Sequence, residues 1–263
     1  MNFPIYQIDA FTNRVFAGNP AAVVVLDKWL DDQILQDIVA ENNLAETAFV
    51  IPSPECSMLR WFTPKLEIDL CGHATLASAH VLFREHYPDQ AHLRFETRSG
   101  TVTVSRKGEL LFLDFPSRPG SPVAIDQMLI DTLGTTPEIA IRSRDLMVLL
   151  KSEAEARQII PNYEAIARLD AFALIVTAHG DEVDFVSRFF APRAGVPEDP
   201  VTGSAHCTLI PYWAGRLGKT KLSARQLSSR GGDLECELHG DRVLIGGAVV
   251  EYMRGEINLG AAS

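Results

Sequence analysis

Two stretches of this sequence share one pattern: RWFTP (residues 60–64) followed by CGHAT (71–75), and RFFAP (188–192) followed by TGSAH (202–206). Each predicts a hydrophobic strand, a polar loop, and a turn of glycine and small residues that opens an apolar helix. Backbone N–H groups are free in the first turn of a helix, where they can hold an anion. Two such helix ends predict a site that holds one anionic substrate from two sides.

The two copies indicate an internal duplication. Arg188 and Arg60 are 128 positions apart (188 − 60), and this offset carries residues 46–51 onto residues 174–179, beside another predicted strand. Two α/β halves can resemble each other by chance, but the shared Arg-aromatic-Phe-x-Pro favours a true repeat. A missed repeat would misassign the whole fold, so we take the duplication as the working prediction.

The length of 263 residues suits one large domain or two of ordinary size. Residues 116–122 contain three prolines and a glycine and are the best linker candidate. We therefore expect two α/β halves, an N-terminal half at residues 1–118 and a C-terminal half at residues 119–263. The expected elements include helices over residues 31–42, 74–83 and 205–213, and strands over 46–51, 172–177, 183–190 and 243–250.

Charge and composition exclude several classes of protein. The net charge of −10 argues against general binding of nucleic acid or of anionic membranes, although a local site can still attract a small anion. No long apolar run and no signal peptide is evident. The four cysteines form no C-x-x-C pair and read as reduced thiols, so we expect a cytoplasmic protein.

Neither a metal nor a cofactor is expected from motifs. The pairs Cys71-x-His73 and His206-Cys207 lack further ligands at the spacing that zinc sites show. The glycine-rich motifs of nucleotide-binding loops do not occur.

Glu46 is the strongest candidate for chemistry. It begins an apolar strand, where an acid is unusual because a desolvated carboxylate is costly. A buried glutamate there would serve as a proton shuttle. The alternative is a strand-end glutamate that points to solvent, and the sequence leaves both open.

Three further residues lie at the two glycine turns. Asp199 precedes the second turn and either caps the helix region, orients a polar group of the substrate, or is a plain turn residue. His73 follows the first glycine and could donate a hydrogen bond or move a proton. Cys71 reads more readily as a buried small side chain than as a nucleophile.

Five stretches together resemble one known family. They occur in family order from end to end, and they are DAFT (9–12), FAGNPAAV (16–23), AETAF (45–49), CGHATLA (71–77) and EDPVTGSAH (198–206). The chain resembles the PhzF-type, phenazine-biosynthesis-like proteins, which have the diaminopimelate-epimerase fold. The resemblance implies two similar halves, each a mostly antiparallel sheet wrapped around a central helix, and a cofactor-independent isomerase that is often a homodimer.

The resemblance also implies roles for particular residues. In the best-known member the substrate is trans-2,3-dihydro-3-hydroxyanthranilate, and a glutamate moves a proton between ring carbons. That glutamate corresponds to Glu46, the general acid and base. The small carboxylate substrate would be bound by side chains and by backbone at the glycine turns: Asn19, Gly72, His73, Asp199, Gly203 and Ser204.

Two positions depart from the patterns of the fold. Racemases and epimerases use a cysteine before each glycine turn, whereas this chain has Cys71 and then Thr202. A serine is frequent before the family glutamate, whereas this chain has Ala45. Two other functions stay open: an amino-acid racemase or epimerase that uses Cys71, and a carboxylate-binding protein without catalysis.

Overall fold

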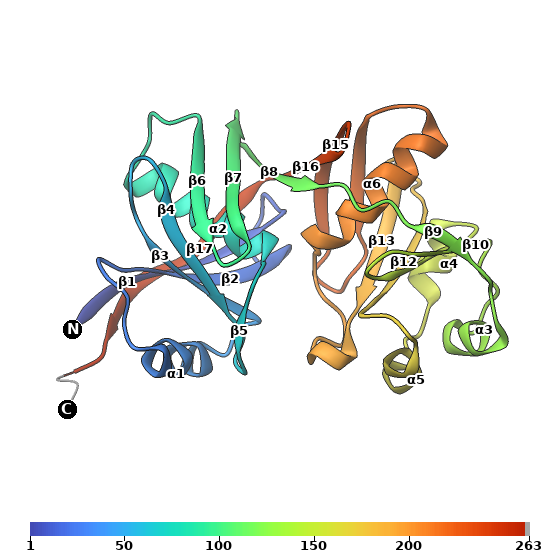
Figure 1. Ribbon diagram of the computed structural model, residues 1–263, viewed down its shortest axis with the longest axis horizontal. Coiled ribbons are helices and arrows are strands. Elements are labelled where there is room, and N and C mark those ends of the chain that lie inside the picture. The colour runs from blue at the N-terminus through green and yellow to red at the C-terminus, as the bar shows by residue number, and fades with distance from the viewer. Residues whose placement is uncertain (261–263) are drawn as a thin grey trace. The chain divides into compact units, whose positions relative to one another are not determined.

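The structure, a computed structural model, describes residues 1–260 and divides into two units. One unit is Met1–Asp114 together with the segment that starts at Gly246, and the other is Phe115–Ile245. In each unit β-strands surround one helix, which is α2 (Gly72–Glu85) in the first and α6 (Gly203–Leu217) in the second (Figure 1). The predicted α/β fold class, with a sheet around a central helix in each half, is confirmed.

The first unit contains a sheet of mainly antiparallel pairs. β1 pairs antiparallel with β2 and with β17, whereas β2 and β3 run parallel. Its elements other than α2 are β1 (Asn2–Ala10), β2 (Asn19–Val25), α1 (Asp32–Asn42), β3 (Glu46–Ile51), β4 (Ser57–Phe62), β5 (Glu67–Ile68), β6 (His92–Thr97), β7 (Gly100–Lys107), β8 (Leu110–Pro116, which runs on into the second unit) and β17 (Val249–Asn258).

Helix α2 is buried because its sequence is small or apolar on every side. Residues 73–79 and 81–83 are all buried, and the helix contacts β1, β2 and β3. A helix that is apolar all round is stable only inside a protein. The sheet therefore curves around it, and the N-terminal end of α2 lies at the starts of β2 and β3, which hold the candidate residues Asn19 and Glu46.

The second unit repeats the order of pairings in the first, where β2–β3 and β4–β6 are parallel and β3–β4 and β6–β7 are antiparallel. β11–β12 and β13–β14 are parallel, and β12–β13 and β14–β15 are antiparallel. Its elements other than α6 are β9 (Ser121–Val123), α3 (Gln127–Leu133), β10 (Ile139–Arg142), β11 (Leu146–Leu149), α4 (Glu153–Gln158), α5 (Tyr163–Arg168), β12 (Leu174–His179), β13 (Phe185–Phe190), the 3-10 helix η1 (Pro192–Ala194), β14 (Lys221–Gln226), β15 (Gly232–His239) and β16 (Arg242–Gly247, which leads back to the first unit).

The offset of 128 relates two strands of the first unit to two strands of the second. Adding 128 to the bounds of β3 gives those of β12, and adding 128 to the bounds of β4 gives those of β13. The direct sequence prediction placed the first of these second-unit strands at 172–177, two residues early. The repeat located it better because it carries the spacing of a whole supersecondary unit.

The duplication extends to one pair of side chains. Arg60 donates from Nε and Nη2 to the two carboxylate oxygens of Glu67, at 2.8 Å each. Arg188 donates from the same nitrogens to Glu198, at 2.8 and 3.1 Å. Both guanidinium groups lie over a phenylalanine ring two residues ahead, at 5.0 and 4.9 Å. The conserved place of this pair in both units supports a common origin.

Helix α6 contains Pro211, which cannot donate a backbone hydrogen bond to the carbonyl four residues earlier. That carbonyl belongs to Cys207, and it accepts a hydrogen bond from the backbone N–H of Arg118 instead, at 2.8 Å. The buried helix therefore tolerates proline because the segment before β9 satisfies the released group.

Residues 246–260 pack with the first unit, whereas the sequence division at 118/119 placed them in the second half. The reason is β17, which pairs with β1 along the whole of β1, from Asn2↔Asn258 to Ala10↔Val249. The chain passes between the units twice, within β8 and within β16.

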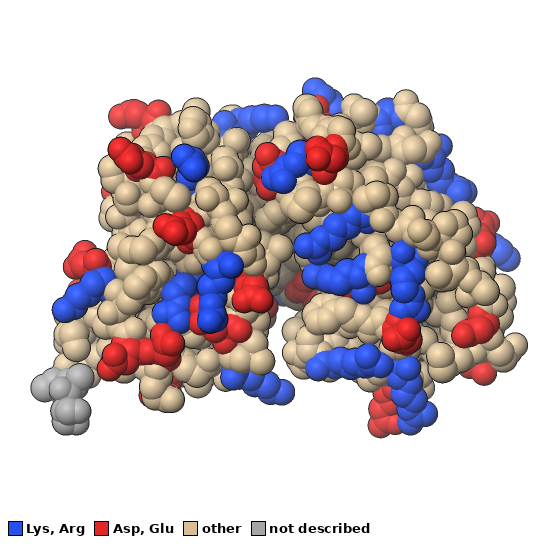
Figure 2. All heavy atoms as spheres, viewed as in Figure 1, with Lys and Arg blue, Asp and Glu red and all other residues tan. Residues whose placement is uncertain are grey.

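The surface has both signs of charge. On the face shown in Figure 2, acidic and basic side chains are interspersed over each unit. Among residues 1–260, no helix combines the length and the apolar character needed to span a membrane.

Candidate active site

Glu46 and His73 lie together in the first unit. Glu46 begins β3, His73 is in the first turn of α2, and Glu46 Oε2 lies 3.0 Å from His73 Nε2. The two side chains are only 13% and 7% exposed. The alternative of a solvent-facing Glu46 is therefore wrong, and a nearly buried carboxylate meets an imidazole.

Asn19 approaches the other nitrogen of the same ring. Its Nδ2 lies 3.2 Å from His73 Nδ1. An amide nitrogen only donates, so in this orientation Nδ1 accepts and the ring proton lies on Nε2, facing Glu46. Rotation of the amide by 180° would present Oδ1 to a protonated Nδ1. Asn19 can thus bind both the neutral and the cationic imidazole.

The turn that precedes Asn19 in the chain has a strained backbone. Phe11 and Phe16 have φ of 62° and 69°, which is rare for residues with a side chain. Gly18 also has a positive φ of +65°, and a Cβ on it would come within 2.1 Å of the Ala10 carbonyl oxygen. Only glycine fits there. Strain of this kind is frequent where a loop must hold one functional side chain in place.

Cys71 is the third member of the buried group. Its Sγ lies 3.6 Å from His73 Nδ1 and 4.0 Å from Nε2. Burial raises the pKa of the Cys71 thiol, which keeps it neutral. Burial also disfavours a charged His73, but a hydrogen bond with Cys71 and the neighbouring Glu46 carboxylate outweigh this effect, so the pKa of His73 lies well above 6.5. The pair Glu46–His73 is thus suited to carry one mobile proton.

Gly72 opens helix α2 directly beside this group. The residue before the helix, Cys71, makes no side-chain capping hydrogen bond, and the same is true of Thr202 before α6. The first N–H groups of both helices therefore keep the capacity to bind an anion.

In the second unit, Asp199 lies beside the start of α6. The Thr202 hydroxyl donates to the Asp199 carboxylate, and Gln226 accepts from the Thr202 N–H at 2.9 Å. Gln226 also donates to the Asp199 carbonyl at 2.7 Å. Asp199 thus binds the side chain of the residue before the helix. The hydroxyl of Thr202, the residue that stands where racemases have the second cysteine, therefore forms a hydrogen bond with Asp199.

Gly203 and Ser204 form the first turn of α6. Ser204 is half-buried, and its Oγ accepts a hydrogen bond from Arg144 Nη2 at 3.3 Å. Arg144 is held by two hydrogen bonds to the buried Asp145, at 3.0 and 2.8 Å, and lies over the Phe172 ring. The second glycine turn therefore has a positively charged side chain beside it.

Sequence reasoning named most of these residues but missed two. The structure brings Asn19, Glu46 and His73 together within the first unit, and it places Asp199, Gly203 and Ser204 in the second unit. The missed residues are Gln226 and Arg144, which contact the second turn across 24 and 60 positions of sequence. No motif marks either of them.

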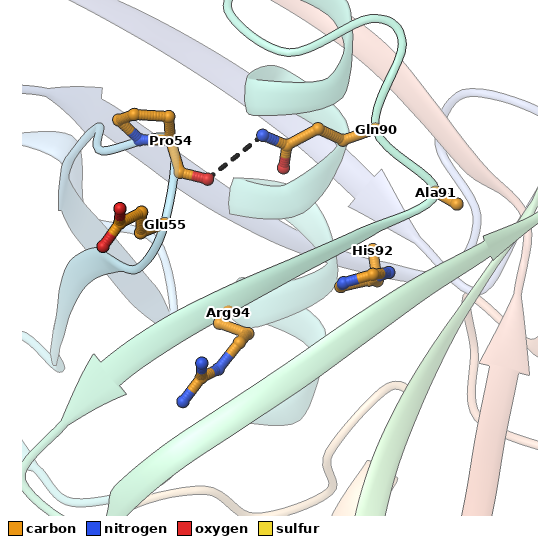
Figure 3. A pocket seen from close by; sticks show the side chains of 6 residues that line it. All are labelled: Pro54, Glu55, Gln90, Ala91, His92 and Arg94. Carbon is orange, nitrogen blue, oxygen red and sulfur yellow. Dashed lines mark hydrogen bonds between the residues drawn. The ribbon is translucent and has the colours of Figure 1, made fainter.

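A pocket of about 480 Å³ on the first unit is separate from these residues. Pro54, Glu55, Gln90, Ala91, His92 and Arg94 line it (Figure 3). Gln90 Nε2 donates a hydrogen bond to the Pro54 carbonyl in its wall, at 3.1 Å. None of the candidate residues lies in its wall, so it is not the site.

Comparison with known proteins supports one assignment. Residues 8–255 match the phenazine biosynthesis-like protein family. An uncharacterized isomerase of Pseudomonas aeruginosa is 52% identical over 260 residues, which cover 98% of this chain and all of that protein. The crystal structure of an Enterococcus faecalis PhzF-family protein superposes with a TM-score of 0.97 at 48% identity, covering 98% of this chain and 100% of that one.

A more distant structure shows the same fold. A hydroxyproline epimerase of Agrobacterium vitis has a TM-score of 0.65 at 10% identity, with 98% of this chain and 93% of that one covered. Fold and comparisons thus define a protein of the epimerase-fold class, with relatives named as isomerases. Within that class, the chain belongs to the phenazine biosynthesis-like, or PhzF, family.

Proposed function

We propose that this protein is a cofactor-independent isomerase that transfers a proton within a small carboxylate substrate, with Glu46 as general acid and base. The observation that carries the proposal is the 3.0 Å approach of Glu46 Oε2 to His73 Nε2 among nearly buried side chains. A general base must have a site for the proton it takes, and an imidazole beside it can share that proton.

The proposal gives each remaining residue a role. His73 orients Glu46 and balances its charge, and Asn19 fixes the ring of His73. Gly72, Gly203 and Ser204 offer helix N–H groups to the substrate carboxylate, and Asp199 binds a polar substituent. A substrate related to trans-2,3-dihydro-3-hydroxyanthranilate would have both features.

The alternative of a racemase that uses Cys71 has less support. Burial raises the pKa of that thiol, which disfavours the thiolate that a base must form. The partner position is Thr202, whose hydroxyl donates to Asp199.

We further propose a homodimer in the cytoplasm. The family resemblance suggests the dimer, and four free cysteines fit a reducing compartment. Light scattering at micromolar concentration should give twice the mass of 28.9 kDa, and the mass of a monomer would reject the dimer.

The test of the activity uses exchange at carbon. A panel of cyclic and amino carboxylates is incubated in deuterated water, and NMR follows deuterium incorporation. Glu46→Gln should reduce exchange by at least about 100-fold, which is the scale of general acid–base catalysis. Glu41→Gln removes an exposed carboxylate of α1 and should leave exchange unchanged. Equal exchange in wild type and Glu46→Gln would refute the role of Glu46.

A further inference from the structure

We propose that Arg118 and Arg144, together with the hydroxyl of Ser204, bind a second acidic group of the substrate, which is a carboxylate or a phosphate ester. This inference rests on the proposed function, in which the first turn of α6 holds the substrate carboxylate. All three residues belong to the second unit, where Ser204 is in the first turn of α6 and both arginines contact this helix.

The segment before β9 brings Arg118 close to Arg144. The backbone N–H of Arg118 donates to the Cys207 carbonyl at 2.8 Å, where this segment crosses α6 (Figure 1). β9 then pairs antiparallel with β10, and a Cβ added to Gly120 would lie 2.7 Å from the Arg142 carbonyl oxygen. Because the pairing is antiparallel, the residues before Gly120 run alongside the turn after Arg142, and that turn carries Arg144.

Both guanidinium groups lie near the same buried thiol. Burial raises the pKa of Cys207 to about 11, while the positive charges of Arg118 and Arg144 act to lower it. The thiol is therefore neutral and supplies no negative charge to the arginines. Cys207 follows Ser204 by three positions, so their side chains share one face of α6. The two arginines and the hydroxyl thus lie along the same face of the helix.

The charges in this cluster do not balance. The two arginines contribute +2 and Asp145 contributes −1, which leaves +1. Asp145 is 2% exposed and accepts from Arg144 Nε and Nη2, at 3.0 and 2.8 Å. Arg118 is half-buried, and within residues 1–260 its guanidinium has neither a hydrogen bond nor an ion pair. A cation that is partly withdrawn from water without an anion is unfavourable, so a ligand with a negative charge would stabilise it.

Ser204 and Arg144 give the site directed donors. Ser204 Oγ accepts from Arg144 Nη2 at 3.3 Å, which leaves its own proton available for an oxyanion. Arg144 Nη1 makes no hydrogen bond within the described part of the chain and can donate to the same group. The guanidinium is held in place by Asp145 and by the Phe172 ring, 4.8 Å away. Fixed N–H and O–H donors of this kind match the several oxygens of a carboxylate or a phosphate.

The inferred substrate is therefore a small dianion. One acidic group occupies the N–H groups at the start of α6, and the other lies against the two arginines. A monocarboxylate would leave Arg118 without an anion, so it would be bound more weakly than a dicarboxylate or a phosphorylated carboxylate of similar size.

The first experiment measures binding without turnover. Inorganic phosphate is titrated into the full-length protein by isothermal calorimetry, and we expect one phosphate per chain. Arg118→Gln should weaken this binding about 10-fold or more, which is the scale of one hydrogen bond to a charged group. Arg94→Gln removes an exposed arginine of the first unit that also has no ion pair within residues 1–260, and it should bind phosphate as the wild type does.

A second experiment identifies the acidic group. Exchange in deuterated water is compared for monocarboxylates, dicarboxylates and phosphorylated carboxylates. Arg118→Gln should lower kcat/KM about 10-fold for a dianion and leave it unchanged for a monocarboxylate. The dianion with the higher kcat/KM in the wild type distinguishes a phosphate ester from a second carboxylate.

Further variants separate the possible outcomes. Ser204→Ala should also weaken phosphate binding, and it replaces Arg118→Gln if circular dichroism shows that the latter does not fold. Glu46→Gln should bind phosphate as the wild type does, so failure of the isomerase is distinguishable from failure of this site. The proposal is overturned if the wild type binds no phosphate, if Arg118→Gln binds it equally well, or if Arg94→Gln loses as much affinity as Arg118→Gln.

Discussion

Glu46 owes its contact with His73 to the fold of the first unit and not to its own segment. The residue 128 positions later is Leu174, which begins β12 as Glu46 begins β3. The duplicated strand thus carries an acid in one unit and an aliphatic side chain in the other. Because His73 corresponds to Ser204 at the helix start, the second unit also lacks the imidazole. The acid–base pair is therefore specific to the first unit.

His206 is a buried histidine whose titration should affect stability. It is fully buried in α6, its Nδ1 donates to the Thr202 carbonyl at 2.8 Å, and its Nε2 has no hydrogen-bond partner among the described residues. Burial lowers the pKa of His206 to about 4. The unfolded chain, with a pKa of ~6.5, binds more protons between these values, so stability falls as the pH is lowered from 6.5 to 4.

We predict the size of this effect from the two pKa values. Between pH 7 and pH 4.5 the wild type should lose about 2 kcal/mol more free energy of unfolding than His206→Gln, which keeps a donor but does not titrate. Urea denaturation at a series of pH values measures the difference. His92→Gln changes an exposed histidine and should follow the wild type. Parallel curves for wild type and His206→Gln would contradict the prediction.

At the scale of elements, Arg188 connects β13 to helix α4. Besides Glu198, its guanidinium donates to the carbonyls of Ala156 and Ile159, at 3.2 and 2.7 Å, where α4 ends. Its side chain is 9% exposed, and that of Arg60, its counterpart in the first unit, is 18% exposed. The buried arginine thus satisfies backbone groups that no other described side chain is seen to satisfy.

We expect the two arginines to differ in their contribution to stability. Arg188→Met should lower the free energy of unfolding by about 3–5 kcal/mol, because it leaves Glu198 and two carbonyls without their partner. Arg60→Met should cost about 1 kcal/mol, since Glu67 keeps Arg98 at 2.7 Å. Chemical denaturation of both variants tests this order, and equal losses would show that burial of the pair is not decisive.

The sequence predicted elements best where their pattern is hydrophobic. The repeat located β12 and β13, because the positions of apolar side chains in the sequence mark buried strands. The sequence prediction missed the extent of β17, all of whose residues are exposed or half-buried and which includes Glu251, Arg254 and Glu256. A strand that lies on the surface and pairs with β1 lacks the alternation that marks a strand.

The candidate site was predictable only in part for a similar reason. Glu46 and His73 stand in short motifs, and the fold of the first unit brings those two motifs together. Gln226 and Arg144 contact the second glycine turn through hydrogen bonds between distant segments, and such contacts produce no periodic pattern in the sequence. Burial of Glu46 also depends on the surrounding sheet, which a strand pattern does not determine.

At the scale of the whole molecule, the described ends of the chain meet. The N-terminal amine of Met1 donates to the Gly260 carbonyl, and Leu259 N–H donates to the Met1 carbonyl, each at 3.0 Å. A chain whose ends are adjacent on the surface tolerates new ends elsewhere, provided that they fall in exposed turns.

A circular permutant should therefore fold. We expect a chain with joined ends and new termini between Lys107 and Gly108, an exposed turn between β7 and β8, to keep its free energy of unfolding within about 2 kcal/mol. Urea denaturation and circular dichroism measure this. A permutant opened between Val186 and Ser187, in buried strand β13, should not fold. Failure of the first permutant, or folding of the second, would contradict the prediction.

The discontinuous first unit has a consequence for synthesis on the ribosome. Phe115–Ile245 is continuous, so the second unit is translated as one uninterrupted stretch. The first unit begins earlier, but β17, the partner of β1, is translated only after the whole of the second unit. Until β17 is translated, the edge of β1 with which it pairs is open to chaperones and proteases.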